Sequence, residues 1–377
     1  MNQATNLENT IRWPQVWSLI ALDVAVIISW IAYHEYQPAL LKQFGFDHMT
    51  LEFAVVQGII LFLTPPIAGW IADRARKKGG SRLPVMNLGI TTVSMIFMVV
   101  AFTIFVNPQG WIVNIFPLMV VLWLISMNVF HSPAYSTVEL FVPAEKLPFV
   151  VAILAVITDL AGAIEPVIVD IIDFFGAPVT FAAGGALVFT TGLLMMRAIK
   201  KLTVQGGNEV TASGYSEPIK SDFIFVLGLG LVLGSAVTFL FDITPIWAIE
   251  RLGFLKSDND NAEANGSIFA AVVMGIAAIA AFPSGYLAEK AGTGKTAIAG
   301  IIVAAAAILA IYYTSGNAAM AFWILFPISF SLMTVSFLPL AFLKLKSAQR
   351  VFGIGLFFSG MEVAGSIFNI IQKKYGG

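Results

Sequence analysis

Two similar five-residue stretches, Gly69-Trp70-Ile71-Ala72-Asp73 and Gly285-Tyr286-Leu287-Ala288-Glu289, organise this sequence. Each closes an apolar stretch long enough to cross a bilayer, and basic residues and glycine follow both copies. The copies begin at residues 69 and 285, which indicates that a unit of several membrane helices occurs twice in the chain. Repeated multi-helix units are the usual construction of secondary transporters.

The composition of the 377 residues is that of a membrane protein. Hydrophobic residues make up 58% and charged residues 11%, and the mean hydropathy is +0.86. The net charge of -1 argues against a basic face for nucleic acid. The absence of cysteine excludes disulfides, thiolate metal sites and cysteine nucleophiles, and three histidines leave little for a histidine metal site. We expect no bound metal, no cofactor and no enzymatic activity.

Eleven segments have the apolar length, about 20 residues, that crosses the hydrocarbon of a bilayer. The predicted spans are 15–41, 50–72, 84–106, 109–131, 147–173, 178–197, 222–249, 266–288, 296–314, 318–341 and 350–371. The turn signal Asn107-Pro108-Gln109-Gly110 separates the third span from the fourth. The polar N-terminus, 1–14, lacks the features of a signal peptide, so the first span is expected to be retained.

The distribution of lysine and arginine predicts the orientation. With a cytoplasmic N-terminus, only Lys42, Arg251, Lys256, Lys373 and Lys374 of the 21 basic residues fall on the outer side. Residues 198–221, which are polar and rich in Gly and Ser, separate six spans in 15–197 from five in 222–377. We therefore expect an all-α polytopic protein with two bundles, six helices plus five, in a bacterial inner (cytoplasmic) membrane.

The first repeated stretch extends through Arg74, Arg76 and Arg82 to Pro84 and forms a basic loop. Gly69 permits close helix approach, and the Asp73 carboxylate could accept from the N-termini of neighbouring helices or pair with an arginine. The alternative is a plain positive-inside loop. With this Gly-x-x-x-Asp-Arg pattern the chain resembles the major facilitator superfamily, whose signature loop joins its second and third helices.

The longer pattern Asp-Arg-x-Arg-x-x-x-Gly-x-Arg-x-Pro is similar to that of the glycoside–pentoside–hexuronide symporters and the related sucrose transporters. Pro38-Ala-Leu-Leu41 and Phe44-Gly-Phe46 resemble the end of their first helix. Pro133-Ala-Tyr-Ser-Thr-Val-Glu139-Leu resembles their junction of helices four and five, where Glu139 stands near an acidic position. The sugar-binding arginine of the sucrose transporters has no counterpart in Trp111 to His131, and this departure argues against sugar.

Five acidic residues lie inside predicted spans, and each is a candidate for ion coupling because an intramembrane charge costs about 2.5–3.5 kcal/mol. They are Asp23, Asp159, Glu165, Asp242 and Glu362. A helix through 147–173 places Asp159, Gly162, Pro166, Asp170 and Asp173 on one stripe, with Glu165 elsewhere and a bend at Pro166. Asp170 and Asp173 are alternatively solvated ends. No span carries Lys or Arg near its centre, so each deep carboxylate is expected to hold a proton or a mobile cation, and anionic substrates are disfavoured.

Further polar and aromatic residues are candidates for a cavity or a gate. His34 and Glu35 form either a proton-sensitive gate or an interfacial pair that reaches water. Asn128 and His131, at the predicted cytoplasmic end of the fourth span, either line a vestibule or form hydrogen bonds between helices. Trp30 and Trp123 are deep enough to stack on a ring-shaped substrate, or they simply contribute to packing.

These observations favour a cation-coupled secondary transporter, driven by protons or sodium, that moves a small neutral or cationic solute by alternating access. The repeated loops, with Gly69, Asp73, Gly285 and Glu289, are expected to act as cytoplasmic latches. The alternative is a facilitator-like subunit that does not transport. A twelfth helix is missing relative to a six-plus-six plan, which would leave a flank of the C-terminal bundle open to a protein partner.

Overall fold

The computed structural model describes residues 10–375 except 79, 108–109, 204–211, 213, 216 and 253–261. The described residues are helical and contain no strand. The long helices are α2 (Trp13–Gln43), α3 (Thr50–Lys77), α4 (Leu83–Val106), α5 (Phe116–Val129), α7 (Leu147–Ala163), α9 (Ala177–Thr203), α10 (Phe223–Thr238), α12 (Ala262–Ala291), α13 (Thr293–Tyr313), α14 (Asn317–Leu343) and α15 (Arg350–Tyr375). Shorter elements are α6 (His131–Ser136), α8 (Glu165–Phe175), α11 (Thr244–Arg251), the 3₁₀ turns η1 (Asp47–Met49), η2 (Gly110–Ile115), η3 (Thr137–Leu140), η4 (Ala144–Lys146) and η8 (Ser347–Gln349), and the π-helix η5 (Phe239–Ile243).

Eleven helical segments of the described chain are long and apolar enough to cross a membrane, which confirms the predicted number. The turn between the third and fourth spans is also confirmed, because α4 ends at Val106 and Asn107 adopts a left-handed backbone with φ of 46°. Pro108 and Gln109 of the turn lie outside the described residues.

The predicted end of the fourth span was wrong. The helical segment runs from Val113 to Leu140, nine residues beyond the predicted limit of residue 131, through α5, α6 and η3. Pro133 reads as the start of a loop in the sequence, but it occupies the first turn of α6, where a missing N–H removes no helical hydrogen bond. Asn128 and His131 consequently lie inside the span, away from its cytoplasmic end.

Two further spans are interrupted. The fifth breaks at Ile164, between α7 and α8 and two residues before Pro166, so the predicted bend is present but the acidic stripe is divided between two helices. The seventh contains the π-helix η5, next to Pro245, which lacks a backbone donor. The Thr244 hydroxyl donates to the Phe239 carbonyl over 2.8 Å and satisfies that group of the widened turn.

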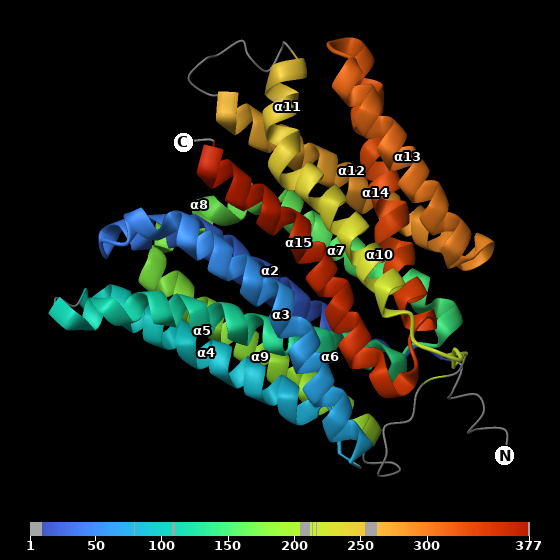
Figure 1. Cartoon of the computed structure of the whole chain (residues 1–377), viewed down its shortest axis with the longest axis horizontal. Helices are drawn as coiled ribbons and strands as arrows, with labels where there is room; N and C mark the ends of the chain where they lie inside the picture. Colours follow the sequence, from blue (N-terminus) through green and yellow to red (C-terminus); the bar gives the residue numbers. More distant parts are fainter. Residues whose placement is uncertain are drawn as a thin grey trace.

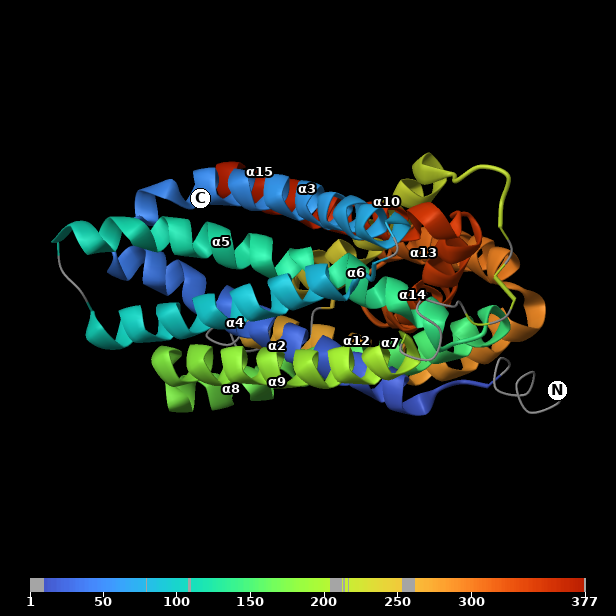
Figure 2. The same ribbon diagram turned by 90° about the horizontal axis from the view of Figure 1, so that it is seen from below.

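The helices form an N-terminal half (α2–α9) and a C-terminal half (α10–α15), which approach each other at one end and diverge toward the other (Figure 1). We call the approaching end cytoplasmic because it carries most of the Lys and Arg residues. Helix α3 runs alongside α15, as Figure 2 shows, and α7 lies against α12. These two seams join the halves.

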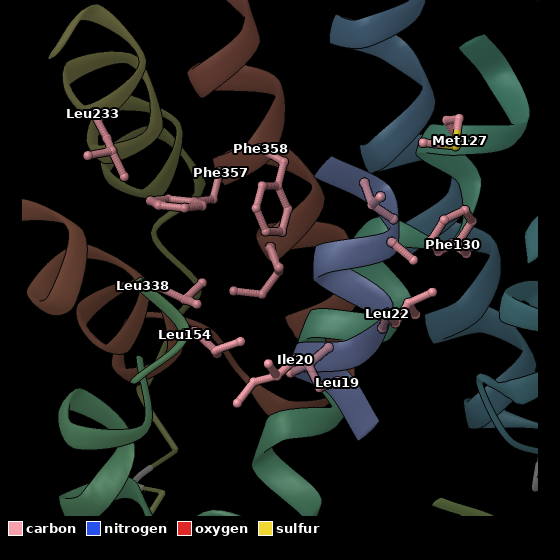
Figure 3. Packing of buried hydrophobic residues seen from close by; sticks show 14 of the residues in the cluster. Leu19, Ile20, Leu22, Met127, Phe130, Leu154, Leu233, Leu338, Phe357 and Phe358 are labelled. Atoms are coloured by element: carbon pink, nitrogen blue, oxygen red, sulfur yellow. The ribbon is translucent and has the colours of Figure 1, made fainter. Parts of the chain in front are cut away.

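Apolar side chains from both halves also share one core. Figure 3 shows Ile20 of α2 and Leu154 of α7 close to Leu338 of α14, with Phe357 and Phe358 of α15 nearby. All five belong to the largest buried cluster. The halves are therefore in apolar contact on the cytoplasmic side.

The α3–α15 seam depends on Gly69, and this predicts a selective effect of a methyl group there. A Cβ at residue 69 would lie 2.7 Å from the Val351 carbonyl carbon and 2.8 Å from Phe352 Cα, both backbone atoms of α15. We expect Gly69→Ala to destabilise the protein by about 1–3 kcal/mol through overpacking, read as a lower thermal-unfolding midpoint in detergent. The control Gly228→Ala in α10, where nothing lies within 4 Å of the added Cβ, is expected to be neutral or stabilising. Equal midpoints for the two variants would contradict this account of the seam.

Candidate functional site

The most concentrated charged site is the cytoplasmic cluster, which we define as Asp73, Arg76, Arg82, Glu139 and Arg350. Glu139 of η3 is completely buried, and its Oε1 accepts from Arg82 over 2.6 Å and from Arg76 over 3.2 Å. Its Oε2 accepts from Arg350 of the C-terminal half. Three guanidinium groups around one buried carboxylate compensate the cost of removing that charge from water.

Asp73 extends this contact to the backbone of α15. Its Oδ2 accepts from Phe352 N over 2.9 Å and its Oδ1 from Val351 N over 3.4 Å. These amides belong to the first turn of α15, which has no intrahelical acceptors for them. The carboxylate at the end of α3 therefore caps a helix of the other half, and it also lies 3.9 Å from the guanidinium of Arg76, so both contacts expected from the sequence are present.

The second repeated stretch makes an equivalent contact on the other seam. Glu289 at the end of α12 pairs with Lys146, the residue before α7. A Cβ at Gly285 would lie 3.2 Å from the carbonyl oxygen of Pro148, the second residue of α7, just as Gly69 faces Val351, the second residue of α15. Unlike the first contact, the Lys146–Glu289 pair is exposed, with 47% and 27% of the side chains accessible.

One residue of the predicted loop motif lies outside the cytoplasmic cluster. Arg74 is exposed and places its guanidinium 5.4 Å from the ring of Trp70 on the same helix. It is therefore positioned to anchor α3 at the membrane surface rather than to join the halves.

The described part of the connecting chain crosses the cluster. The Ala212 amide donates to the Glu139 carbonyl over 2.7 Å, and the Tyr215 hydroxyl donates to the Val142 carbonyl over 3.0 Å. The Tyr215 ring also lies 5.2 Å from the Arg350 guanidinium. Burial raises the pKa of Tyr215, so its hydroxyl remains a donor. This segment covers the closed cytoplasmic side.

The membrane carboxylates form a second, dispersed group. Asp23 and Asp159 are each 7% exposed, and the Oδ2 atom of each is buried without a hydrogen-bond partner. Asp23 Oδ1 accepts from the Tyr135 hydroxyl over 2.6 Å. Glu165 and Glu362 are half-buried, and Asp242, in the π-helix, is exposed. Among the described residues no three His, Cys, Asp or Glu side chains are placed to hold a metal ion.

The two candidate stacking residues belong to an aromatic cluster near the outer side. The ring of Trp123 is stacked on Tyr33 at 4.4 Å and lies 5.1 Å from Trp30. Trp123 is buried, so Tyr33 covers the face that a substrate ring would need in this arrangement. His34 lies 5.5 Å from Trp30 and is exposed, as is Glu35.

The remaining two candidates have well-defined neighbours. The Asn128 side chain donates to the Leu124 carbonyl of its own helix over 2.8 Å. The His131 ring is stacked on Phe358 of the C-terminal half, with 4.2 Å between centroids. His131 therefore contributes to the contact between the halves.

Sequence reasoning did not single out Tyr135, Lys146, Tyr215 or Arg350 as functional residues. Two signals were available, because Tyr135 lies within the Pro133–Leu140 stretch and Arg350 begins the last helix. Neither signal identifies the partner, which comes from a distant part of the chain.

Comparisons with known proteins give the family and the fold. The model of the Major Facilitator Superfamily matches residues 18–369. The chain is similar in structure to the human organic anion transporter MFSD10 (TETRAN), with a TM-score of 0.69, 12% identity and coverage of 96% of this chain and 94% of the other. It is also similar to a bacterial homologue of the iron transporter ferroportin in an outward-facing state with soaked iron (TM-score 0.68, 15% identity, coverage 96% and 92%). The fucose:proton symporter of E. coli gives a TM-score of 0.59 at 13% identity, with coverage of 96% and 92%. No curated protein matches the sequence significantly.

Removal of the buried carboxylate tests the cytoplasmic cluster. We expect Glu139→Gln to weaken the closed arrangement by about 3–5 kcal/mol, because the buried guanidinium groups of Arg82 and Arg350 and the partly buried one of Arg76 lose their common counter-charge. The chain has no cysteine, so spin labels at Lys78→Cys and Lys295→Cys report the separation of the two halves at the cytoplasmic end. A longer distance should become populated in the variant and not in the exposed control Glu52→Gln. An unchanged distribution would show that the cluster does not hold the halves together.

The exposed pair of the second seam should behave differently. Because exposed ion pairs contribute little, at most about 1 kcal/mol, we expect Glu289→Gln to leave the distance between labels at 78 and 295 close to that of the parent. Double electron–electron resonance in the same detergent gives the comparison. A shift as large as that of Glu139→Gln would mean that the two seams contribute equally.

Proposed function

Because the chain belongs to the Major Facilitator Superfamily, we propose that it is a cation-coupled secondary transporter that moves a small neutral or cationic solute by alternating access. Protons or sodium ions supply the driving force. In this proposal 15–197 and 222–377 are the two moving units, and the cytoplasm-closed arrangement is the outward-facing state. The bias of basic residues toward one side supports placement in the inner membrane of a bacterium.

The observation that carries the proposal is the environment of Asp159. Asp159 is 7% exposed and lies in the last turns of α7, a helix of the α7–α12 seam, four residues before that helix ends at Ala163; its Oδ2 atom has no hydrogen-bond partner. A fixed negative charge at such a place is costly unless it is neutralised. A carboxylate that must take up a cation, on a helix where the halves meet, is suited to couple cation binding to their movement.

The placement of basic residues supports the solute class. In the described membrane helices every Lys and Arg lies within seven residues of a helix end. A negatively charged solute would therefore find no counter-charge at mid-depth, whereas Asp23, Asp159 and the half-buried Glu362 favour a neutral or positively charged one.

Replacement of Asp159 tests the coupling. A thermal-shift screen of sugars, nucleosides, amino acids and organic cations first identifies a solute that stabilises the purified protein. Uptake of that solute is then measured in proteoliposomes under an imposed proton or sodium gradient. We expect Asp159→Asn to lower gradient-driven accumulation at least about tenfold, because the amide cannot take up a cation, while solute exchange without a gradient continues.

The control is Glu250→Gln, which removes an exposed carboxylate at the outer end of α11. Its accumulation should equal that of the parent protein. Undiminished gradient-driven accumulation by Asp159→Asn would contradict the role of this carboxylate in coupling.

A further inference from the structure

The segment from His131 to Leu140, formed by α6 and η3, packs against α3 and α4 of its own half and α15 of the other, and we call it the coupling segment. The Ser132 hydroxyl donates to the Pro65 carbonyl of α3 over 2.8 Å. Tyr135 donates to Asp23 of α2, and Ser136 accepts from Arg82 over 2.9 Å. One short segment thus joins a membrane carboxylate to the cytoplasmic cluster.

The coupling segment is separated from the helix before it. Helix α5 ends at Val129 and α6 begins at His131, with Phe130 between them. Pro133 contributes no backbone hydrogen bond to that junction. Phe130 keeps a right-handed helical backbone and its carbonyl accepts from Ala134 N over 2.8 Å, so this junction lacks only the bond that a residue other than proline at 133 would donate. We take it as the place where the segment shifts relative to α5.

The coupling segment contacts α15 at two points. His131 is stacked on Phe358 with an interplanar angle of 20°, and Glu139 is paired with Arg350. His131 and Glu139 are eight residues apart in the coupling segment, and their partners Phe358 and Arg350 are eight residues apart in α15, in the reverse order. The two contacts therefore fit one antiparallel alignment of the two segments. Tyr135 lies midway between them, with its ring 5.0 Å from Phe358. A shift of the segment consequently disturbs both contacts between the halves.

Asp23 uses only one of its oxygens in this arrangement. Oδ1 accepts from Tyr135, and Oδ2 is buried without a partner. A cation at Oδ2 would neutralise the carboxylate. The hydrogen bond from Tyr135 would then lose its charge assistance, which roughly doubles the strength of such a bond.

We propose that Tyr135 is a positioning residue that transmits the loading of Asp23 to the cytoplasmic cluster. With Asp23 unloaded, the charge-assisted bond holds the coupling segment where His131 and Glu139 meet α15, and the cytoplasmic side is closed. A cation at Oδ2 weakens that bond, releases the segment and opens the cytoplasmic side. This inference rests on the proposed cation coupling and adds its direction, since loading from outside leads to opening inside, as in symport.

Titratable groups on the elements packed against α2 and α6 belong in the interpretation of any pH series. They are His131 and Tyr135 of α6, Asp159 of α7 and, one turn beyond Phe358, Glu362 of α15. The charged side chains of α8 and α9 lie toward the outer end and the cytoplasmic end, respectively. None of them hydrogen-bonds to Asp23 in the described structure, whereas Tyr135 does.

The test uses the full chain with spin labels at positions 78 and 295 and needs no solute. We expect Tyr135→Phe to raise the population of the cytoplasm-open state about tenfold, the effect of losing one charge-assisted hydrogen bond. Asp23→Asn, which resembles the loaded carboxyl, should open the protein similarly. Combined with Tyr135→Phe it should add nothing, because both changes remove the same bond. Fully additive effects, or no effect of Tyr135→Phe, would overturn the proposal.

The control is Tyr36→Phe, which removes a hydroxyl of α2 that donates to the Ile172 carbonyl of α8, far from α6 in the chain. Its distances should match those of the parent. A second measurement needs no change at residue 135. The labelled parent is compared in acidic and alkaline buffers, each with sodium or with potassium, and opening should increase with acid or with sodium. Distances that respond to neither overturn the proposal whether or not the variants fold.

The two hypotheses fail in different ways. Unchanged label distances in Tyr135→Phe, together with lost accumulation in Asp159→Asn, reject the role of Tyr135 and leave the coupled transporter standing. Changed label distances in Tyr135→Phe, together with undiminished accumulation in Asp159→Asn, reject Asp159 as the coupling residue and leave the link between Asp23 and the cytoplasmic cluster.

Discussion

A single buried carboxylate, that of Glu139, pairs with arginines of both halves at the cytoplasmic end. Arg76 and Arg82 belong to the same half as Glu139, and only Arg350 comes from the other. Glu139 therefore has two counter-charges within its own half, and Arg350 also donates to the Leu345 carbonyl of its own half over 3.1 Å. No charge is left buried and alone, which removes the largest cost of breaking an internal ion pair.

The two copies of the repeated stretch make similar contacts between the halves: the copy in the N-terminal half contacts α15, and the copy in the C-terminal half contacts α7. In each copy the glycine allows a helix end to approach the second residue of a partner helix, Val351 for Gly69 and Pro148 for Gly285. The acidic residue, four positions later, reaches the start of that partner helix. The resulting seams, α3–α15 and α7–α12, are both antiparallel and related to each other by the repeat. The ion pairs of the two seams differ, because the α3–α15 seam includes the buried Glu139 whereas the α7–α12 seam has the exposed Lys146–Glu289 pair. In the proposed alternating access, the two seams would stay in contact while the Glu139–Arg350 pair separates.

Local sequence determines part of this structure, and the rest depends on packing between distant segments. Hydropathy and charge predicted the eleven spans, the turn at Asn107 and the bend near Pro166, because each follows from solvation or from backbone chemistry within a few residues. The same approach failed at Pro133, since a proline in the first turn of a helix and one in a loop look alike in the sequence. Hydropathy and charge also did not predict that Glu139 pairs with Arg350 or that Tyr33 stacks on Trp123. Those contacts exist only once the helices have assembled.

The acidic residues of the chain fall into two classes because of where the basic residues lie. Lys and Arg are confined to helix ends, so Asp73 and Glu139 have permanent counter-charges, while Asp23 and Asp159 have none within the described structure. The first class can act as fixed structural charges. The second has an unpartnered oxygen on each carboxylate, which is the basis of the proposed cation binding. Tyr135 is the point where the classes meet, since its segment holds Asp23 at one residue and Glu139 four residues later. A protein that kept all its carboxylates paired would be more stable, but it would lack the unpaired groups on which the proposed cation coupling depends.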